Sequence, residues 1–192
     1  MKDMAADTPT SLTGFAVAGS VSASTRPSRL EDEVVALFDQ LRAPVLRYLL
    51  SLRITIPDAE EIIQEVFLSL FRHLKQNKSR ANLQAWIFKV AHNIGVKRRA
   101  QAWRESQRFS DADPALAEDC NPGPEEALAA RQRQQRLLAV VRALPEQDQW
   151  CLSLRAEGLR YREISEVLGM SLGSVASSLE KSLARLTRAE RI

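Results

Sequence analysis

The sequence predicts an all-α protein with two small helical domains joined by an acidic flexible linker, the C-terminal domain being a helix-turn-helix. Apolar residues recur at three- and four-residue spacing in two long stretches, which is typical of helices packed on a core. The 192 residues include only 7 glycines and 6% aromatic residues, which favours helices over a sandwich or barrel. An acidic segment punctuated by prolines separates the two stretches.

These patterns divide the chain into four parts. Residues 1–29 are rich in Ser, Thr, Ala and Gly without an apolar stripe, so we expect a disordered tail. We expect a first helical domain over residues 30–104, the linker over 105–127, and a second helical domain over 128–192.

Charge is distributed very unevenly along the first domain. The stretch from Val66 to Arg104 contains nine Lys or Arg residues and no Asp or Glu, although the whole chain has a formal net charge of only +3. Four acidic residues precede it directly: Asp58, Glu60, Glu61 and Glu65. The domain should therefore carry a surface for a polyanion beside a docking surface for a basic protein partner.

The first domain reads as a series of helices. An apolar stripe begins near Glu31, and we expect Pro44 to open a second helix. We expect the next helix to start at Pro57 and Asp58, with Asp58 as its cap and Glu61 reaching back to it. We expect residues 75–81 to form a loop, and we expect Asn82 to cap a long helix that ends near Arg104.

Two aromatic residues lie near the start of that long helix. Trp86 falls on its predicted apolar stripe, so we expect it in the core rather than stacked on a base. Phe88 is then the aromatic residue that we expect to be exposed.

The linker carries seven acidic residues against a single Arg108, and Pro114, Pro122 and Pro124 prevent a continuous helix. The negative charge of the linker would attract it to a basic cleft that normally holds nucleic acid. The alternative is that the linker is only a solvated tether between the two domains.

The second domain has the pattern of a DNA-reading module. Residues 161–168 form a short helix, Gly169 to Ser171 supply a tight turn, and Ser171 or Ser174 caps the next helix. We expect Val175, Leu179, Leu183 and Leu186 to hold that helix on the core. Small polar side chains would then face outward, as a helix entering the major groove requires. The alternative to a DNA-reading module is an ordinary helical hairpin with serines on its solvent-exposed face.

Two motifs together resemble a known family. Residues 58–67 (DAEEIIQEVF) and 85–93 (AWIFKVAHN) are similar to region 2 of the extracytoplasmic-function (ECF) sigma factors of the sigma-70 family. Leu144-Pro145, the segment from Tyr161 and Gly173-Ser174-Val175 resemble their region 4, in the expected order. The resemblance covers roughly residues 31 to 188.

The resemblance implies a bacterial transcription initiation factor without enzymatic activity. Such a factor binds core RNA polymerase, recognises the −10 and −35 promoter elements and promotes DNA melting. By matching position, the surface that docks on the clamp helices of the largest polymerase subunit would be formed by Asp58, Glu61, Gln64 and Glu65. An anti-sigma factor commonly covers these faces in the family.

The resemblance also assigns the promoter contacts. The loop after Lys75 matches the specificity loop that receives a flipped base of the −10 element, and cations beside it would hold the separated strand. We expect −10 contacts from Lys75, Gln76, Asn77, Lys78, Arg80, Asn82, Lys89, Asn93, Lys97 and Arg98. We expect −35 contacts from Arg160, Tyr161, Arg162, Ser174, Ser177, Ser178, Lys181 and Arg185.

Other classes fit less well. Cys120 and Cys151 form no CxxC unit, and His73 and His92 have no further ligands at suitable spacing, so we expect no disulfide, metal or cofactor. No segment approaches the roughly 20 apolar residues of a membrane span, and Leu12 to Val21 lacks the positive flank of a secretion signal, which predicts a cytoplasmic protein. A dimeric helix-turn-helix regulator of duplex operator DNA remains the alternative function.

Overall fold

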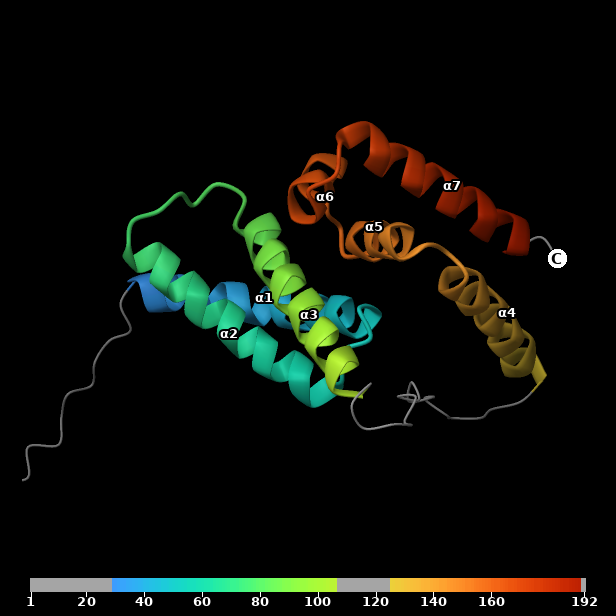
Figure 1. Cartoon of the computed structure of the whole chain (residues 1–192), viewed down its shortest axis with the longest axis horizontal. Helices are drawn as coiled ribbons and strands as arrows, with labels where there is room; N and C mark the ends of the chain where they lie inside the picture. The colour runs from blue at the N-terminus through green and yellow to red at the C-terminus, as the bar shows by residue number, and fades with distance from the viewer. Residues whose placement is uncertain (1–28, 107–124, 191–192) are drawn as a thin grey trace, which may run out of the picture.

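The computed structural model describes residues 29–106 and 125–190, and every regular element within these ranges is a helix (Figure 1). The helices are α1 (Arg29–Ser51), α2 (Ile56–Lys75), α3 (Leu83–Ser106), α4 (Glu125–Arg142), α5 (Glu146–Ala156), α6 (Tyr161–Leu168) and α7 (Leu172–Glu190). The all-α prediction is therefore confirmed. The predicted tail and most of the predicted linker lie outside the described residues, and the predicted domain limits stay a prediction.

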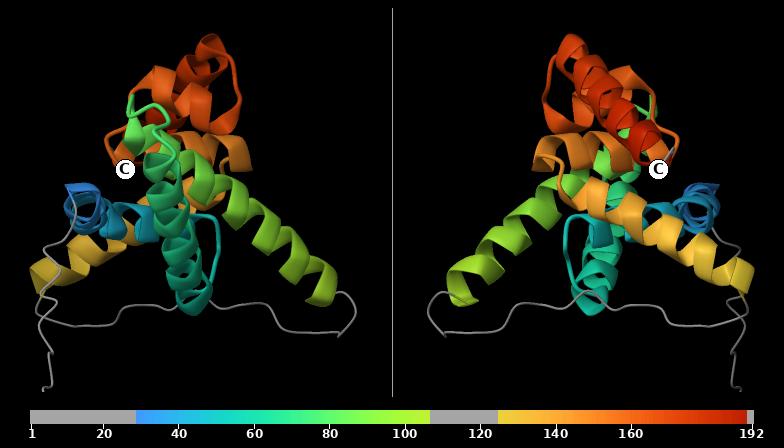
Figure 2. Two further views of the ribbon diagram at one scale, coloured as in Figure 1. Left: turned by 90° about the vertical axis from the view of Figure 1, so that its left-hand side faces the viewer. Right: turned by 90° about the vertical axis from the view of Figure 1, so that its right-hand side faces the viewer.

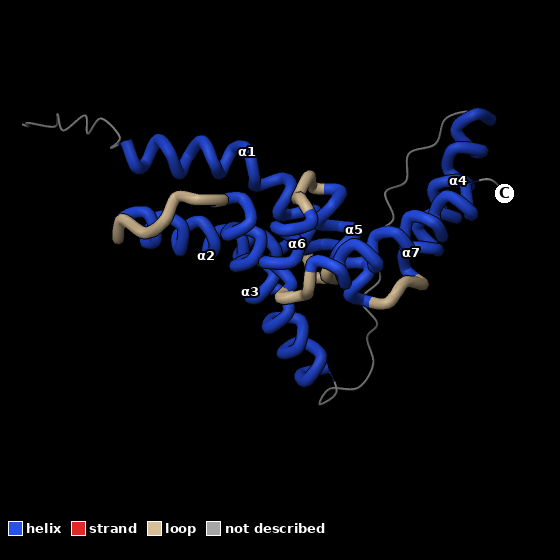
Figure 3. The backbone as a smooth tube through the Cα atoms, turned by 90° about the horizontal axis from the view of Figure 1, so that it is seen from above, coloured by secondary structure: helices blue, strands red, loops and turns tan. Residues whose placement is uncertain are grey.

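Helix α1 is a single helix, so the prediction that Pro44 opens a second one is wrong. Proline lacks the backbone N–H and crowds the preceding turn, which normally breaks a helix. Here Leu41 and Val45 are buried on either side of Pro44, and Tyr48 and Leu49 follow on the same face. Packing of this face against α2 keeps the helix continuous through the proline (Figure 3).

The start of α2 also differs from the prediction, because Thr55 and not Asp58 caps the helix. The Thr55 hydroxyl accepts a hydrogen bond from the Asp58 backbone N–H at 3.4 Å and donates one to Asp58 Oδ2 at 2.6 Å. Pro57 sits in the first turn, where no intrahelical partner for its N–H is needed. This places Asp58 inside the helix, one turn before Glu61.

Helices α1, α2 and α3 enclose the first core. Phe38 meets Phe67 edge-on with ring centroids 5.0 Å apart, and Tyr48 meets Phe88 in the same way at 5.7 Å. Phe88 is fully buried, so the prediction that it is exposed is wrong, whereas Trp86 is partly buried and packs against the core as predicted. The reason is that α3 contacts helices on two sides, which extends its buried face to Phe88 and His92.

The second core lies among α5, α6 and α7, with α4 packed along α7 (Figure 1). Its fully buried side chains include Cys151, Leu154, Leu159, Ile164 and Leu179. Burial raises the pKa of the Cys151 thiol, which therefore behaves as an apolar core residue.

The two groups of helices meet where α1 and α3 contact α5 and α6, a contact called the seam below. Trp150 of α5 lies edge-on to His92 of α3 at 5.1 Å, and the Arg99 guanidinium lies 5.5 Å from the Trp150 ring centroid. Arg99 also pairs with Glu146 at 3.0 Å. Arg47 of α1 pairs with Glu157 through two hydrogen bonds of 2.9 and 2.6 Å.

His92 is a buried titratable group at the seam. Its Nδ1 lies 2.8 Å from the Tyr48 hydroxyl. Burial, and then the positive charge of Arg99, lowers the pKa of His92 from 6.5 to about 4. The neutral imidazole is therefore the form that fits the folded chain.

We predict that lowering the pH destabilises the chain through His92. The folded-state pKa lies below the unfolded one, so this contribution is complete above pH 6.5 and is lost as the pH falls toward 4. The loss should be on the order of 2 kcal/mol at pH 5. Urea unfolding at pH 7.5 and pH 5 measures it, with His92→Gln as a variant that cannot titrate. An equal loss in both proteins would contradict this role for His92.

Candidate functional site

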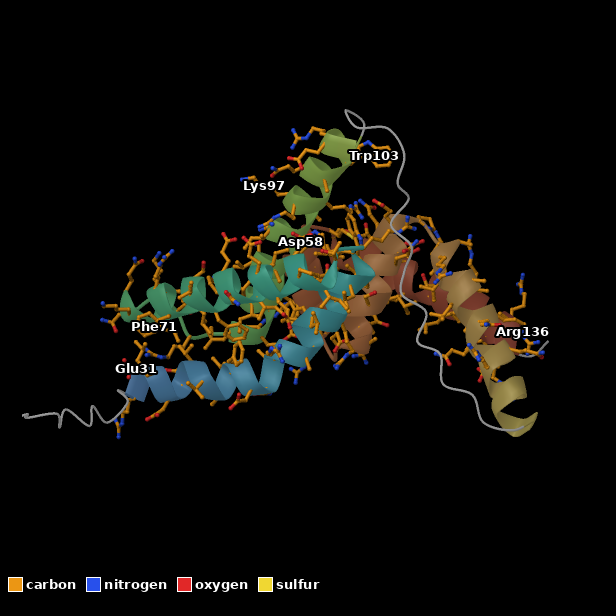
Figure 4. The ribbon with its side chains drawn as sticks, turned by 90° about the horizontal axis from the view of Figure 1, so that it is seen from below. Glu31, Asp58, Phe71, Lys97, Trp103 and Arg136 are labelled. Atoms are coloured by element: carbon orange, nitrogen blue, oxygen red, sulfur yellow. The ribbon has the colours of Figure 1, made fainter. Side chains whose placement is uncertain are left out.

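Three exposed side chains form a polar row along α3, called the basic face below: Lys89, Asn93 and Lys97. They are spaced by four residues, so they lie one above the other along one side of the helix. The second half of α3 projects away from the helices around it, and Lys97 and Trp103 lie along this projecting part (Figures 2 and 4). Trp103 is 66% exposed and had no predicted role, although its place among cations was a usable signal.

Arg98 does not belong to this row. Its guanidinium turns toward α2 and pairs with Asp58 at 3.1 Å and with Glu61 at 3.0 Å. The hydrogen bond to Glu61 is the main cause of the raised pKa of Arg98. This pairing uses the charge of Arg98 within the chain, and its predicted contact with DNA stays a prediction. Asp58 lies close to the start of the projecting part of α3 (Figure 4).

The predicted docking residues lie together on α2 and are called the acidic face below: Asp58, Glu61, Gln64 and Glu65. Glu61, Gln64 and Glu65 are exposed, and Asp58 is partly buried. Beside Gln64 a shallow groove of about 310 Å³ opens between α1 and α2, lined also by Phe38, Arg42, Glu60 and Ile63. No pattern in the sequence indicated that Phe38 and Arg42 of α1 line a groove beside the acidic face.

The loop between α2 and α3 carries the other predicted −10 residues. Lys75, at the end of α2, and every residue from Gln76 to Asn82 are exposed. Arg80 points toward α1, where Glu33 accepts from its Nε at 3.3 Å. Asn82 caps α3 as predicted, since its Oδ1 accepts from the Ala85 backbone N–H at 3.4 Å.

Helices α6 and α7 form the predicted helix-turn-helix. Gly169 ends α6 in the left-handed conformation (φ +65°), which only glycine adopts at little cost. Ser171 caps α7, because its hydroxyl accepts from the Ser174 backbone N–H at 3.1 Å. The Ser165 hydroxyl donates to the Met170 carbonyl at 2.6 Å and fixes the turn from the α6 side.

Most of the predicted −35 residues are on the surface of this unit. Ser177 is partly buried, and the exposed ones are Arg160, Tyr161, Arg162, Ser174, Lys181 and Arg185.

Ser178 is the exception among them, because it is only 6% exposed. Its hydroxyl donates to Asp148 Oδ1 at 2.6 Å and joins α7 to α5. The prediction that Ser178 faces DNA is wrong.

The buried face of α7 is also rotated from the predicted one. Val175 and Leu179 are buried as predicted, but Ser178 and Ser182 lie beside them and Leu183 is 49% exposed. Helices α4 and α5 both approach this side of α7, and serine lets their backbones come close. An apolar groove of about 290 Å³ remains between α4 and α7, with Arg185 and Arg188 on its rim.

Neither a metal centre nor a membrane span is present in the part of the chain that the structure describes. No three His, Cys, Asp or Glu side chains gather there as metal ligands. The described helices are also too short or too polar to cross a bilayer.

Two family models match the chain. Residues 37–105 match sigma-70 region 2 and residues 134–186 match sigma-70 region 4.

The chain is also similar to curated proteins. It is 32% identical over 133 residues to the ECF RNA polymerase sigma factor SigE of Mycolicibacterium smegmatis. The matched region covers 67% of this chain but only 50% of SigE. It is 23% identical over 158 residues to the RNA polymerase sigma factor YlaC of Bacillus subtilis, covering 82% of this chain and 91% of YlaC.

Solved structures share the fold. The sigma factor RpoE of Bartonella quintana, crystallised with the anti-sigma factor NepR, superposes with a TM-score of 0.61 at 18% identity over 84% of this chain and 96% of RpoE. CnrH, solved in complex with the cytosolic domain of CnrY, gives a TM-score of 0.54 at 19% identity over 82% of this chain and 86% of CnrH.

We predict that Ser178→Ala lowers stability by about 1 kcal/mol, because Asp148 loses a hydrogen-bond donor in a partly buried site. Ser177→Ala is the matched control, since the same truncation one residue earlier removes a hydroxyl from a more open position. Urea unfolding of both variants measures the difference. Equal stability of the two variants would show that the bond to Asp148 contributes nothing.

Proposed function

Because this chain belongs to the sigma-70 family as an ECF sigma factor, we propose that it directs core RNA polymerase to promoters and helps to melt them. One observation carries the residue-level proposal. The exposed basic face and the exposed polar loop lie on one domain that matches sigma-70 region 2, and Arg98 pairs with the acidic face. The dimeric-regulator alternative finds no support, because residues 37–105 match sigma-70 region 2.

We propose that the acidic face docks on the clamp helices of the largest polymerase subunit. Glu61, Gln64 and Glu65 present two carboxylates and an amide within one helical turn, which suits a basic helical partner. Arg98 neutralises the Asp58 end of this surface and fixes Glu61 in place. Glu65 therefore offers the charge that is most available to a partner.

We propose that the basic face and the loop hold the melted −10 strand. Lys89 and Lys97 are exposed and two turns apart on α3, and Lys97 lies on its projecting part, where a single strand can pass. Phosphate contacts of this kind provide affinity, and the loop provides base selection. The cost of unstacking a base, a few kcal/mol, is offset by these contacts.

We propose that α7 reads the −35 element in duplex form, with Lys181 and Arg185 on phosphates and Ser174 and Ser177 near base edges. The elements lie roughly 25 base pairs apart, on the order of 85 Å of duplex. Two domains that stay in contact at the seam cannot bind the −10 and −35 elements at the same time. We therefore propose that the contacts at the seam break when polymerase and promoter bind.

The acidic face and the basic face are also exposed to an anti-sigma factor. The anti-sigma factor NepR is bound to RpoE of Bartonella quintana, a protein of the same fold. We propose that such a partner holds this chain in the cytoplasm, where polymerase works. Run-off transcription with purified core polymerase on a library of genomic fragments tests the whole function, because promoter-specific transcripts should require this protein.

We predict that Glu65→Lys weakens binding to core polymerase at least tenfold, because it sets like charges against a basic partner. Asp39→Lys, the same change of charge on an exposed position of α1, is the control. Affinity is measured by fluorescence titration of labelled protein with core enzyme. Equal affinities of the two variants would refute the docking assignment.

We predict that Lys97→Ala makes binding of single-stranded −10 DNA less salt-dependent, reducing the slope of log K against log salt by about 0.7. Lys181→Ala should instead change the slope for duplex −35 DNA, by about 0.9. Each variant is the control for the other, and binding is measured with the polymerase complex. Unchanged slopes would show that these lysines do not contact phosphates.

A further inference from the structure

The loop between α2 and α3 is polar and exposed, so burial cannot fix its shape. Residues 76–82 (QNKSRAN) contain no apolar side chain except that of Ala81, and all seven residues are exposed. Its conformation therefore depends on hydrogen bonds and on the ends of the two helices. A pocket for a single base needs such a loop to be held in one shape before the base arrives.

Both ends of the loop are held by backbone geometry. At the end of α2 the Lys78 N–H donates to the His73 carbonyl at 3.3 Å and the Asn77 N–H to the Leu74 carbonyl at 3.0 Å, with Asn77 left-handed at φ +52°. At the start of α3 Asn82 is left-handed at φ +53° and caps the helix through Ala85. Asparagine adopts this conformation more readily than most residues.

The middle of the loop is held by His73, a residue of the last turn of α2. Its Nε2 lies 2.8 Å from the carbonyl oxygen of Ser79. A carbonyl only accepts, so His73 carries a proton on Nε2 and donates it. The Ser79 hydroxyl in turn accepts from the Ala81 backbone N–H at 3.2 Å. The bond from His73 therefore reaches the centre of the loop.

The same imidazole contacts α3. Its ring centroid lies 4.7 Å from that of Trp86, with the ring planes inclined by 41°. Trp86 is partly exposed and lies three residues before Lys89, the first residue of the basic face. His73 thus joins the loop of the proposed −10 site to the end of α2 and to Trp86 of α3.

We propose that His73 is a positioning residue, which fixes the loop relative to Trp86 and thereby sets how strictly the loop selects a base of the −10 element. The inference rests on the proposed function, because it needs the loop to receive a base. Sequence reasoning assigned His73 no role, since the pattern of residues around it suggested no ligand or contact. Its function follows from two contacts that only the folded chain brings together.

Two substitutions separate these contacts. His73→Phe keeps an aromatic ring beside Trp86 but removes the donor to Ser79. His73→Gln places an amide N–H where the imidazole Nε2 lies and removes the ring. Ser69→Ala, a polar truncation one turn earlier on α2, is the matched control. All four proteins should keep the fold, because the loop and position 73 lie outside the fully buried core.

The experiment has two readouts on the full chain. Amide hydrogen exchange of residues 76–82 in the free protein reports the tether, and it does not depend on transcription. The polymerase complex is then titrated with single-stranded −10 probes that differ at one base. We expect His73→Phe to speed exchange and to reduce base discrimination by roughly 3- to 10-fold, the range that one hydrogen bond supports. His73→Gln should restore both toward wild type, and Ser69→Ala should change neither.

Two results would overturn the inference. Unchanged exchange in His73→Phe would show that the hydrogen bond does not hold the loop. Faster exchange with full base discrimination would show that the loop shape does not set the selection. If the wild-type complex discriminates no base at all, the proposed function fails first and the inference fails with it, so the two failures are distinguished by the wild-type titration.

Discussion

The bridge from Arg98 to Asp58 and Glu61 is the interaction on which the arrangement of both faces depends. It lies where the acidic face of α2 meets the start of the projecting part of α3 (Figure 4). One cation, Arg98, joins α3 to α2 there, while Lys89 and Lys97 are exposed to solvent. An exposed bridge of this kind contributes little stability by itself, so its importance is geometric. Carboxylates and lysines that would otherwise attract one another are kept on surfaces that can bind two different partners.

The packing behind that bridge makes the geometry rigid. Gly95 lets α3 approach α1 closely, because a Cβ there would lie 3.0 Å from the Leu52 side chain. His92 and Tyr48 satisfy each other nearby in a buried hydrogen bond. The seam uses the same end of α1 and the same part of α3, through Trp150, Arg99 and the pair of Arg47 with Glu157. The core that orients the basic face therefore also holds the second domain, while the basic face itself stays exposed.

The sequence was sufficient for the fold class, the family and those helix ends that are marked by local chemistry, such as Asn82 and Ser171. The predictions from the sequence were wrong at positions whose environment is set by tertiary contacts. Pro44 stays inside a helix because the residues around it are buried, and Ser178 turns inward because Asp148 lies opposite it. Phe88 is buried because α3 is covered on two sides. Arg98 looks like its neighbouring cations in the sequence, and only the position of α2 distinguishes it.

The central claim is that one domain presents DNA-binding and polymerase-binding surfaces on different helices. The most direct measurement is site-specific crosslinking in a promoter open complex, with a photoreactive residue at position 93 on α3 or at position 65 on α2. The account predicts that position 93 crosslinks to the non-template strand and position 65 to the largest polymerase subunit. Crosslinks of position 93 to polymerase alone, or of position 65 to DNA, would contradict it.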